Sequence, residues 1–278
     1  MLWWGPDFIQ IYSDPYRPVL GSKHPVLGLG RPVRECWSEI RHILRPLIET
    51  PFKGGPATWM EDIFLEINRY GFIEETHFTI AYSPGPDESV ADGIGGVLAT
   101  VHEITEKVRN ERRLALLQKL GARSTYAKSA VDACASAAQI LLNAKDVPFS
   151  LFYLIDEERK TARLTAASGI GEGLDASPIT IELAGADPWG AFNAQEADKL
   201  QIVQNIRSAF QHLPSGPWPE PPNSAAVIPI RSNVSRQPAG VLIGGISPRQ
   251  QFDEQYSSFF ELLATQVATA IANARQLL

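Results

Sequence analysis

The stretch Phe149–Ala167, FSLFYLIDEERKTARLTAA, decides the fold of the second half of the chain. Two runs rich in strand-forming residues, Phe149–Ile155 and Thr161–Ala167, flank the charged residues 156–160. Two such runs joined by a short polar segment predict an antiparallel hairpin. A helix is predicted before the hairpin, because apolar residues recur there at helical spacing until Pro148. These residues are Ala127, Ala130 or Val131, Cys134, Ala138 and Leu141.

The chain stays rich in strand-forming residues after the hairpin. Further strands are predicted at Ile179–Leu183, Leu200–Val203, Ala225–Arg231 and Ala239–Ile246, and a helix at Ala191–Lys199. The last two strands are apolar, which is typical of a buried sheet. Leu213–Asn223 contains five prolines, so it is predicted to be a stiff loop rather than a helix or an inner strand.

A long helix is predicted from Phe252-Asp253-Glu254 to the end of the chain, with Asp253 as its cap. Its apolar residues alternate steps of four and three, which is heptad spacing. They are Tyr256, Phe260, Leu263, Val267, Ala270, Ala274 and Leu277. The spacing indicates a parallel dimer, although packing of this helix on its own sheet would produce the same pattern.

The first half begins with a predicted strand at Phe8–Tyr12, and Ser13-Asp14-Pro15 then predicts a helix start. A Gly/Pro-rich passage over residues 21–32 breaks regular structure. Arg34–Thr50 has helical spacing, and Pro46 is expected to kink or shorten that helix. Three strands are predicted next, at Ala57–Asn68, Glu75–Tyr82 and Ile94–His102, with turns at Gly71 and Pro84–Asp87. A charged, Leu-rich helix at Thr105–Lys119 follows, with Gly121 as its expected C-terminal cap.

Composition narrows the classes of function. A chain of 278 residues predicts about two domains. The formal charge of -6 argues against nucleic-acid binding, which needs a dense Lys/Arg surface. Cys36 and Cys134 are too few for a disulfide framework or a zinc site, so we expect free thiols in the cytoplasm. No apolar run is long enough for a membrane span. The bulky residues at the start predict that the natural protein continues upstream.

The first half resembles a PAS domain in three motifs. Asp7–Arg17, DFIQIYSDPYR, resembles the strand-to-helix passage of a bacterial PAS subgroup, and Arg34–Ile40, RECWSEI, resembles the start of its long helix. Glu103-Ile104-Thr105-Glu106 resembles the Asp-Ile-Thr motif at the end of the domain, with Glu in place of Asp. Only Met1–Trp4 stands where a first PAS strand is expected, so that strand could be missing.

The second half resembles a GAF domain in the order of its elements: an N-terminal helix, the Phe149–Ala167 hairpin, the apolar Ala239–Ile246 strand and the final helix. The resemblance implies an α+β fold with two domains, each a central antiparallel sheet flanked by helices. The implied domains are a PAS-like sensor at 1–105, a connecting helix at 106–121 and a GAF-like sensor at 122–278. PAS-GAF tandems resemble the input halves of histidine kinases and other two-component proteins.

Five residues are pocket candidates, since ligand sites favour aromatic walls with a few polar groups. They are Trp37, His42, Trp59, Tyr153 and Trp189. His42 could also ligate haem iron, but Arg41 and Arg45 beside it indicate a solvated helix face. A core position is the favoured interpretation for Trp37 and Trp59. Neither cysteine lies where a covalent bilin or flavin attaches in related sensors, so none is expected, and the cofactor is unknown.

Three near-motifs of catalysis lack their structural context. His102-Glu103-Ile104 matches the opening of a phosphoacceptor box, but His102 ends a predicted strand. Asp92–Gly96 resembles an ATP lid, and a tight hairpin explains its glycines as well. Gly169–Gly173 could cradle phosphate only if a helix followed, and a strand is predicted there instead.

These observations predict a sensory input module without catalytic residues. It would bind a small ligand or a partner and transmit the signal through its connecting helices to an output domain outside the chain. A homodimer through helical segments is expected. The alternatives are a ligand-free dimerisation or interaction scaffold and, less favoured, a kinase fragment that uses His102.

Overall fold

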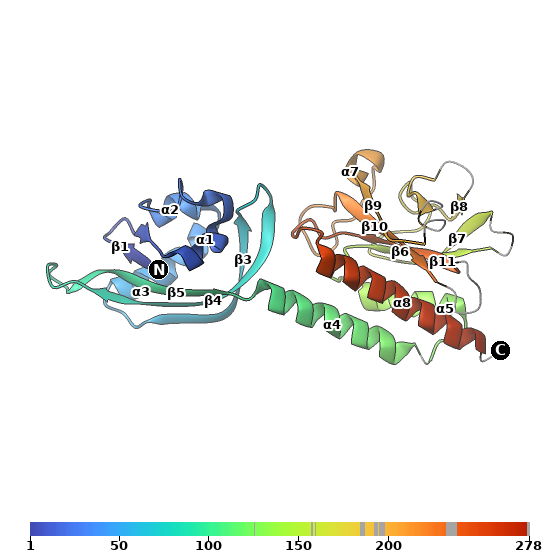
Figure 1. The fold of residues 1–278 in the computed structure, drawn as a ribbon, viewed down its shortest axis with the longest axis horizontal. Coiled ribbons are helices and arrows are strands. Elements are labelled where there is room, and N and C mark those ends of the chain that lie inside the picture. The colour runs from blue at the N-terminus through green and yellow to red at the C-terminus, as the bar shows by residue number, and fades with distance from the viewer. Residues whose placement is uncertain are drawn as a thin grey trace. The chain divides into compact units, whose positions relative to one another are not determined.

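The computed structural model describes residues 1–124, 126–156, 158, 160–183, 187–191, 194, 198–231 and 238–276. The chain divides into two compact units, Met1–Asn110 (unit 1) and Glu111–Leu278 (unit 2). Each unit contains one antiparallel sheet with helices (Figure 1). The predicted α+β fold with two antiparallel sheets is therefore confirmed.

The sheet of unit 1 has five strands in the order β2-β1-β5-β4-β3. The strands are β1 (Leu2–Trp4), β2 (Ile9–Ile11), β3 (Thr58–Asn68), β4 (Ile73–Pro86) and β5 (Ile94–Glu103). β3, β4 and β5 form the predicted meander, and β1 lies between β2 and β5, where Leu2 pairs with both Ile11 and Leu98. The first strand is thus present, although it is only three residues long.

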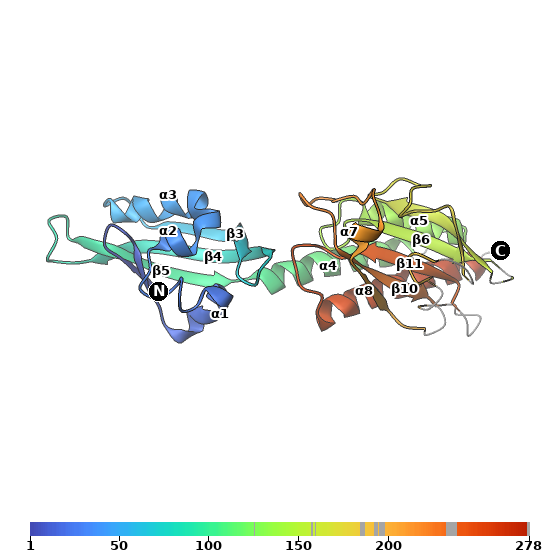
Figure 2. The same cartoon turned by 90° about the horizontal axis from the view of Figure 1, so that it is seen from above.

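The helices of unit 1 come after β2 and before β3 in the chain, and they pack on this sheet (Figure 2). They are the 3-10 helices η1 (Asp14–Tyr16), η2 (Gly21–Lys23) and η3 (Ser38–Ile40) and the α-helices α1 (Arg17–Leu20), α2 (Val33–Cys36) and α3 (Arg41–Phe52). The helix start predicted at Ser13-Asp14-Pro15 is confirmed: Ser13 is the N-cap of η1.

The single helix predicted over Arg34–Thr50 is wrong, because the chain leaves the helical conformation at Trp37. The Lys23 Nζ donates a hydrogen bond to the Cys36 carbonyl at 2.5 Å and satisfies one of the free carbonyls at the end of α2. The Lys23 ammonium also lies 4.5 Å from the centre of the Trp37 ring. A residue 13 positions upstream of Cys36 therefore stabilises the helix break, and no local pattern contains that information.

Proline has less effect on unit 1 than predicted. α3 continues through Pro46, because His42, whose carbonyl loses its donor, is exposed to water. β4 likewise continues through Pro84 to Pro86, where a turn was predicted. Pairing with β3 ends at Tyr82, so one edge of β4 is open beyond it and missing N–H groups cost little there.

The sheet of unit 2 has six strands in the order β8-β7-β6-β11-β10-β9. The strands are β6 (Ser150–Ile155), β7 (Thr161–Ser168), β8 (Thr180–Glu182), β9 (Gln201–Gln204), β10 (Ser224–Ile230) and β11 (Gly240–Gly245). The predicted Phe149–Ala167 hairpin is confirmed as β6 and β7, in which Leu151 pairs with Ala167. A four-residue helix, α7 (Ile206–Ala209), was not predicted.

Both faces of the unit 2 sheet are covered, which explains its apolar strands. Phe152 and Leu242 point to the face covered by α5 (Ala130–Leu141) and α8 (Glu254–Gln276), here called the helix face. Their neighbours Leu151 and Val241 point to the opposite face, here called the loop face. Figure 1 shows α5 and α8 on one side of the sheet and α7 on the other.

α8 packs on its own sheet along the side that carries the heptad spacing. The described members of that pattern are at most 8% exposed, and all lie in the helix-face core. Packing of α8 on its own sheet therefore accounts for the heptad spacing, and a parallel dimer is not needed to explain it. The predicted cap is confirmed, since the Asp253 carboxylate accepts a hydrogen bond from the Tyr256 N–H at 2.8 Å.

α4 (Thr105–Arg123) is the predicted helix between the halves, but Gly121 does not end it. A Cβ on Gly121 would lie 3.4 Å from Gln266 Oε1 of α8, which is an ordinary contact, so this position of α4 does not require glycine. None of the described helices is long and apolar enough to cross a membrane. The helix predicted at Ala191–Lys199, the loop at 156–160 and Leu277 fall partly or wholly outside the described residues.

Candidate functional site

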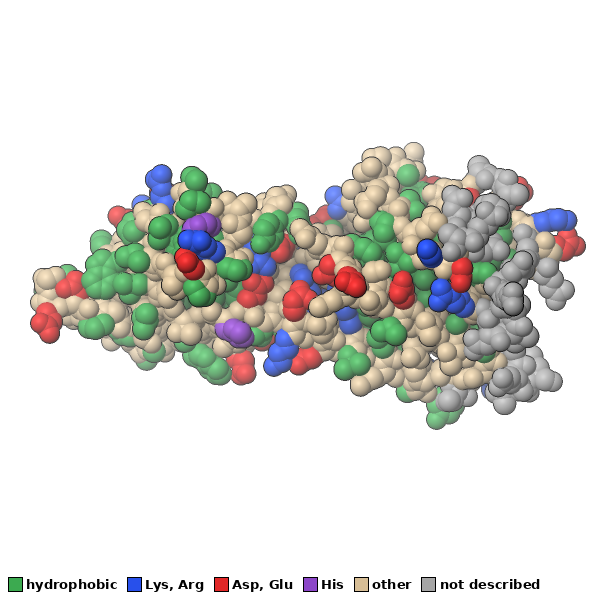
Figure 3. Space-filling view, viewed as in Figure 1, with side chains coloured by type: hydrophobic (Ala, Val, Ile, Leu, Met, Phe, Trp, Pro, Cys, Tyr) green, Lys and Arg blue, Asp and Glu red, His purple; other side chains and the backbone are tan. Residues whose placement is uncertain are grey.

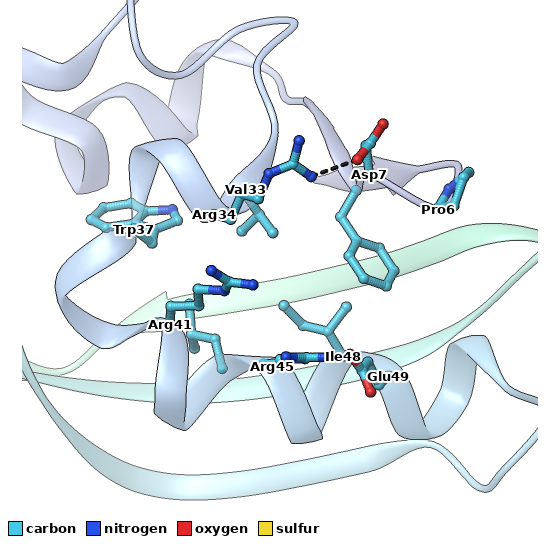
Figure 4. A pocket seen from close by; sticks show the side chains of 11 residues that line it. Pro6, Asp7, Val33, Arg34, Trp37, Arg41, Arg45, Ile48 and Glu49 are labelled. Atoms are coloured by element: carbon cyan, nitrogen blue, oxygen red, sulfur yellow. Dashed lines mark hydrogen bonds and ion pairs between the residues drawn. The ribbon is translucent and has the colours of Figure 1, made fainter.

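A cavity of about 160 Å³ lies in unit 1 between the β1–β2 turn and the helices α2 and α3. We call it the arginine pocket (Figure 4). It is lined by Pro6, Asp7, Phe8, Val33, Arg34, Trp37, Arg41, Leu44, Arg45, Ile48 and Glu49. Apolar side chains and three guanidinium groups thus share one small volume.

Local backbone geometry shapes the mouth of this pocket. Gly5 has φ +71° and Phe8 has φ 52°, so the β1–β2 turn contains a bulky residue in the left-handed region. Such a residue is an outlier that the surrounding structure must stabilise. The Val33 N–H donates to the Phe8 carbonyl at 3.0 Å, and the Phe8 ring packs edge-on against Phe52 at 4.9 Å. The turn is thereby held against α2 and α3.

Two of the carboxylates near the pocket are already paired. Asp7 accepts a hydrogen bond from Arg34 at 2.5 Å. Glu49 accepts from Arg45 at 2.6 Å and from Lys53 at 2.7 Å. The bonds from Lys53 and Arg45 lower the pKa of Glu49 to about 2, so this group is ionised at neutral pH. Among residues 1–124, all of which the structure describes, the side chain of Arg41 has no hydrogen-bond or ion-pair partner.

The three candidates of unit 1 have different environments. Trp37 is 2% exposed and lines the arginine pocket, so the prediction of a core position is confirmed for it. Trp59 is 62% exposed on β3, so a core position is wrong for this residue. β3 is an edge strand, and a β-bulge between Met60 and Ile63, where Asp62 has φ 54°, turns Trp59 away from the core that includes Ile63 and Leu65. His42 is exposed on α3 beside Arg41, as expected for a solvated face.

The two candidates of unit 2, Tyr153 and Trp189, lie together in the loop-face core and are fully buried. The Trp189 ring stacks on Phe210 at 4.4 Å, and its Nε1–H donates to the Ala176 carbonyl at 2.9 Å. The Tyr153 hydroxyl donates to the Pro178 carbonyl at 2.8 Å, and burial raises the pKa of this tyrosine. Both rings are thus packed among buried side chains, and the polar atom of each is hydrogen-bonded.

A buried carboxylate in unit 2 binds the second half of α4. Asp146 is 0% exposed and accepts two hydrogen bonds from Arg112, at 2.7 and 2.9 Å, and one from Gln250 at 2.8 Å. Arg113 lies 3.4 Å from the same carboxylate and 4.3 Å from the Tyr256 ring centre. We call these five residues the Asp146 clamp.

The clamp joins two further parts of unit 2 to α4. Tyr256 of α8 donates its hydroxyl hydrogen to the Asp146 backbone carbonyl and accepts from the Ser247 N–H at 3.0 Å. Burial and then the Asp146 charge raise the pKa of Tyr256. Gln250 belongs to the segment between β11 and α8 and accepts from Arg113 at 2.5 Å. Removing one partner of such a buried charge lowers the stability of the fold strongly, because the charge is left without compensation.

The first turn of α4 is fixed within unit 1 by a second polar network. Arg69 binds Glu103 through two hydrogen bonds, at 2.8 and 2.7 Å. The Thr105 hydroxyl donates to Glu103 at 2.9 Å and accepts from the His77 N–H at 3.0 Å. Burial alone would raise the pKa of Glu103, but the bonds from Arg69 and Thr105 outweigh it and lower the pKa. The Glu103-Ile104-Thr105 motif thus anchors the start of α4.

The remaining sequence candidates lie outside these three sites. His102 is exposed on β5, which is a strand and not a helix. The Asp92–Gly96 segment forms the end of the β4–β5 hairpin, and Gly93 has φ +70°. Gly169–Gly173 leads to β8 and not to a helix. Cys36 and Cys134 are buried free thiols, and burial raises the pKa of Cys134 to about 12. The described residues contain no cluster of ligands suited to a metal ion.

Sequence reasoning missed the charged residues of these sites. Arg41 and Arg45 were interpreted as a solvated face and both are exposed, but nothing local shows that the β1–β2 turn lies across a cavity from them. Asp146, Arg112 and Arg113 carry no motif, because Asp146 is separated from Gln250 by 104 positions. The Glu103 motif was the one signal that could be found from the sequence.

Comparison with known proteins assigns the second unit. The family model for the GAF domain matches residues 127–272. The chain belongs to the GAF domain family. The matched GAF domain contains α5, α8 and all six strands of the unit 2 sheet. A PAS match for unit 1 is not part of this finding.

Solved structures similar to this chain include two GAF domains and one reductase. The GAF domain of an Acinetobacter phosphoenolpyruvate-protein phosphotransferase is 22% identical, with 59% of this chain and 95% of that one covered and a TM-score of 0.45. Free methionine-R-sulfoxide reductase from Neisseria meningitidis is 20% identical, with coverages of 60% and 92% and a TM-score of 0.46. The phycoerythrobilin-bound GAF domain of a cyanobacterial phytochrome is 14% identical, with coverages of 59% and 96% and a TM-score of 0.43. No curated protein sequence matches.

Proposed function

We propose that this chain is a sensory and regulatory module in which a PAS-like unit 1 and the GAF domain of unit 2 act on each other through α4. GAF domains are generally regulatory modules that bind ligands. The output domain would lie outside this chain, and the module itself would have no catalytic activity. The two buried free thiols favour a reducing compartment, so the proposed location is the cytoplasm.

One observation carries the proposal: α4 is fixed by buried polar groups in each unit. Thr105 belongs to the Glu103 network of unit 1, and Arg109 donates to the Glu75 carbonyl there at 2.7 Å. Arg112 and Arg113, within one turn of Arg109, bind Asp146 of unit 2. Because buried polar groups tolerate few alternative geometries, a change in either unit would alter the stability of this helix.

The PAS-like assignment of unit 1 rests on its motifs and on the order of its elements. A strand, several short helices and a three-strand meander follow one another, as the resemblance implies. The strand-to-helix motif begins at the mouth of the arginine pocket with Asp7, and the RECWSEI motif supplies Arg34 and Trp37 to its wall. The motifs that resemble the family therefore surround the cavity of unit 1.

Hydrogen exchange along α4 tests the proposal. Arg112→Gln removes the two shortest bonds from α4 to Asp146 and leaves Arg113 and Gln250 in place. We expect faster amide exchange throughout residues 105–123, including the part of α4 that belongs to unit 1. The matched control is Arg231→Gln, which breaks an exposed ion pair with Asp198 in the same unit. Faster exchange confined to residues 111–123, or no change, would contradict transmission through α4.

A ligand-free interaction scaffold is the second candidate, because the loop-face core of the GAF domain is filled by its own side chains. Native mass spectrometry and an absorbance scan of the purified chain separate the two candidates. A small molecule that copurifies with the chain supports the sensor, whereas an unliganded dimer supports the scaffold. The predicted homodimer would need a surface other than the buried side of α8, such as Leu114 of α4, which is 55% exposed.

A further inference from the structure

The arginine pocket of unit 1 combines two kinds of surface that suit one kind of ligand. Its apolar wall includes Val33, Leu44 and Ile48, which are 8%, 5% and 1% exposed. Its charged side chains are three arginines and two carboxylates, so cations are in excess. Figure 4 shows Arg41 extending from α3 into the space below Arg34, with Ile48 on the same helix. A ligand here would meet hydrocarbon on one side and guanidinium on the other.

Arg41 is the guanidinium that is free to bind. Arg34 is paired with Asp7 at 2.5 Å, and Arg45 is paired with Glu49 at 2.6 Å. Residues 1–124 are all described, and none of them forms an ion pair with Arg41. A guanidinium presents five N–H donors in a planar fork, which matches the two oxygens of a carboxylate. Since the neighbouring cations are already paired, Arg41 offers one binding position for one negative charge.

The size of the cavity limits the rest of the ligand. A cavity of about 150 Å³ with a hydrocarbon lining is large enough for benzene, and the arginine pocket measures about 160 Å³. A single ring or a branched aliphatic group of similar size therefore fills the cavity. The aromatic neighbours Phe8 and Trp37 add ring surfaces to the lining.

We propose that the arginine pocket binds a small monocarboxylate that carries one aromatic ring or a branched aliphatic group of similar size. The carboxylate pairs with Arg41, and the apolar group packs against Val33, Leu44 and Ile48. The ligand thereby joins α2, α3 and the β1–β2 turn, which supply these residues. This inference deepens the proposed function because it names the ligand class of unit 1, but its test does not depend on transmission through α4.

Binding of 4-fluorobenzoate, followed by ¹⁹F NMR titration and checked by calorimetry, tests the inference. We expect saturable binding at one site per chain. Two further probes test the ring and the charge separately. 4-Fluorobenzamide has the ring without the charge, and fluoroacetate has the charge without the ring. Each is expected to bind at least about tenfold more weakly, which corresponds to about 1.4 kcal/mol.

Variants assign the binding to this pocket. Arg41→Gln should weaken 4-fluorobenzoate binding at least tenfold, and Arg41→Lys should retain part of the affinity. Arg41 is exposed, so both variants are expected to fold, and near-UV circular dichroism checks this. The matched control Arg31→Gln removes an exposed arginine of the same unit that does not line the pocket, and it should bind as the unchanged chain does.

The results that would overturn the inference are distinct. They are absence of saturable binding, equal affinity for the amide and the carboxylate, equal affinity for fluoroacetate and 4-fluorobenzoate, or unchanged binding by Arg41→Gln. If 4-fluorobenzoate binds but α4 exchange does not respond to Arg112→Gln, the ligand class stands and the proposed transmission fails. If α4 responds but no carboxylate binds, the reverse holds.

Discussion

The two units share a plan, an antiparallel sheet with helices, but they differ in how their side chains use the available space. In unit 2 the loop face is closed by Trp189, which stacks on Phe210 and donates to a backbone carbonyl. In unit 1 the β1–β2 turn approaches α3 without closing the gap, and a cavity of about 160 Å³ with three arginines is left. The comparison shows that sheet topology does not create a ligand site. The segments that pack beside the sheet decide whether space remains.

A cavity made in the loop-face core of unit 2 should have the largest effect on stability. Trp189→Ala removes a fully buried indole and is expected to lower the free energy of unfolding of unit 2 by about 3–5 kcal/mol. Urea unfolding followed by near-UV circular dichroism measures the loss. Added indole should restore part of it, because the vacated volume has the shape of that ring. A loss below about 1 kcal/mol would show that the loop face is not a tightly packed core.

Acid should affect unit 1 through Glu103. The pKa of this carboxyl is lowered in the folded state, so its contribution to stability is complete above the unfolded value of about 4.3. The contribution is lost as the pH falls through the lower folded pKa. Glu103→Gln should cost about 1.5–3 kcal/mol at pH 7, because hydrogen bonds to a charged group are lost.

Thermal unfolding at several pH values checks this prediction. Below about pH 4 the difference between Glu103→Gln and the unchanged chain should shrink. The control is Glu88→Gln, an exposed carboxylate of the β4–β5 loop, which should show little difference at any pH. A difference that stays constant with pH would assign the loss to packing and not to charge.

Partly filling the arginine pocket should make unit 1 resemble unit 2. Val33→Ile adds one methylene group to a wall of the cavity and is expected to stabilise unit 1 by about 0.8 kcal/mol. The same change should weaken 4-fluorobenzoate binding, since it occupies ligand volume. Thermal unfolding and the ¹⁹F titration measure both effects on one sample. Destabilisation together with unchanged binding would place residue 33 outside the binding volume.

The smallest effect is expected at Trp59, the tryptophan on the exposed side of β3. Trp59→Ala should change the free energy of unfolding by less than about 0.5 kcal/mol, because the side chain is 62% exposed. Because Trp189→Ala makes the same substitution at a buried position, the difference between the two variants measures the contribution of burial to stability. Urea unfolding under identical conditions provides the comparison. A loss comparable to that of Trp189→Ala would indicate that β3 is covered in solution.

The sequence predicted elements well where the pattern is local. The β6–β7 hairpin, the apolar strands β10 and β11 and the Asp253 cap of α8 all follow from residues near one another in the chain. Predictions failed where a distant residue intervened. The helix predicted over Arg34–Thr50 breaks at Trp37, where Lys23 caps α2. Gly121, the predicted end of the connecting helix, lies within α4.

The pocket candidates show the same division between local pattern and tertiary contact. The aromatic residues Trp37, Tyr153 and Trp189 were chosen by residue type, because ligand sites favour aromatic walls, and all three are buried. Their roles differ only through what lies opposite them. Trp189 meets Phe210 and fills its unit, whereas Trp37 borders a cavity.

The hairpin Phe149–Ala167 and the helices around it determined by themselves that the second half is an α+β domain, since alternation and capping act over a few residues. Its likeness to a GAF domain came from the order of these elements. Only the tertiary structure decided that Asp146 binds two arginines of α4, and that Arg41 faces an open volume. The physical reason is that the energy of a charge depends on its desolvation and its partners, and these are supplied by segments distant in sequence.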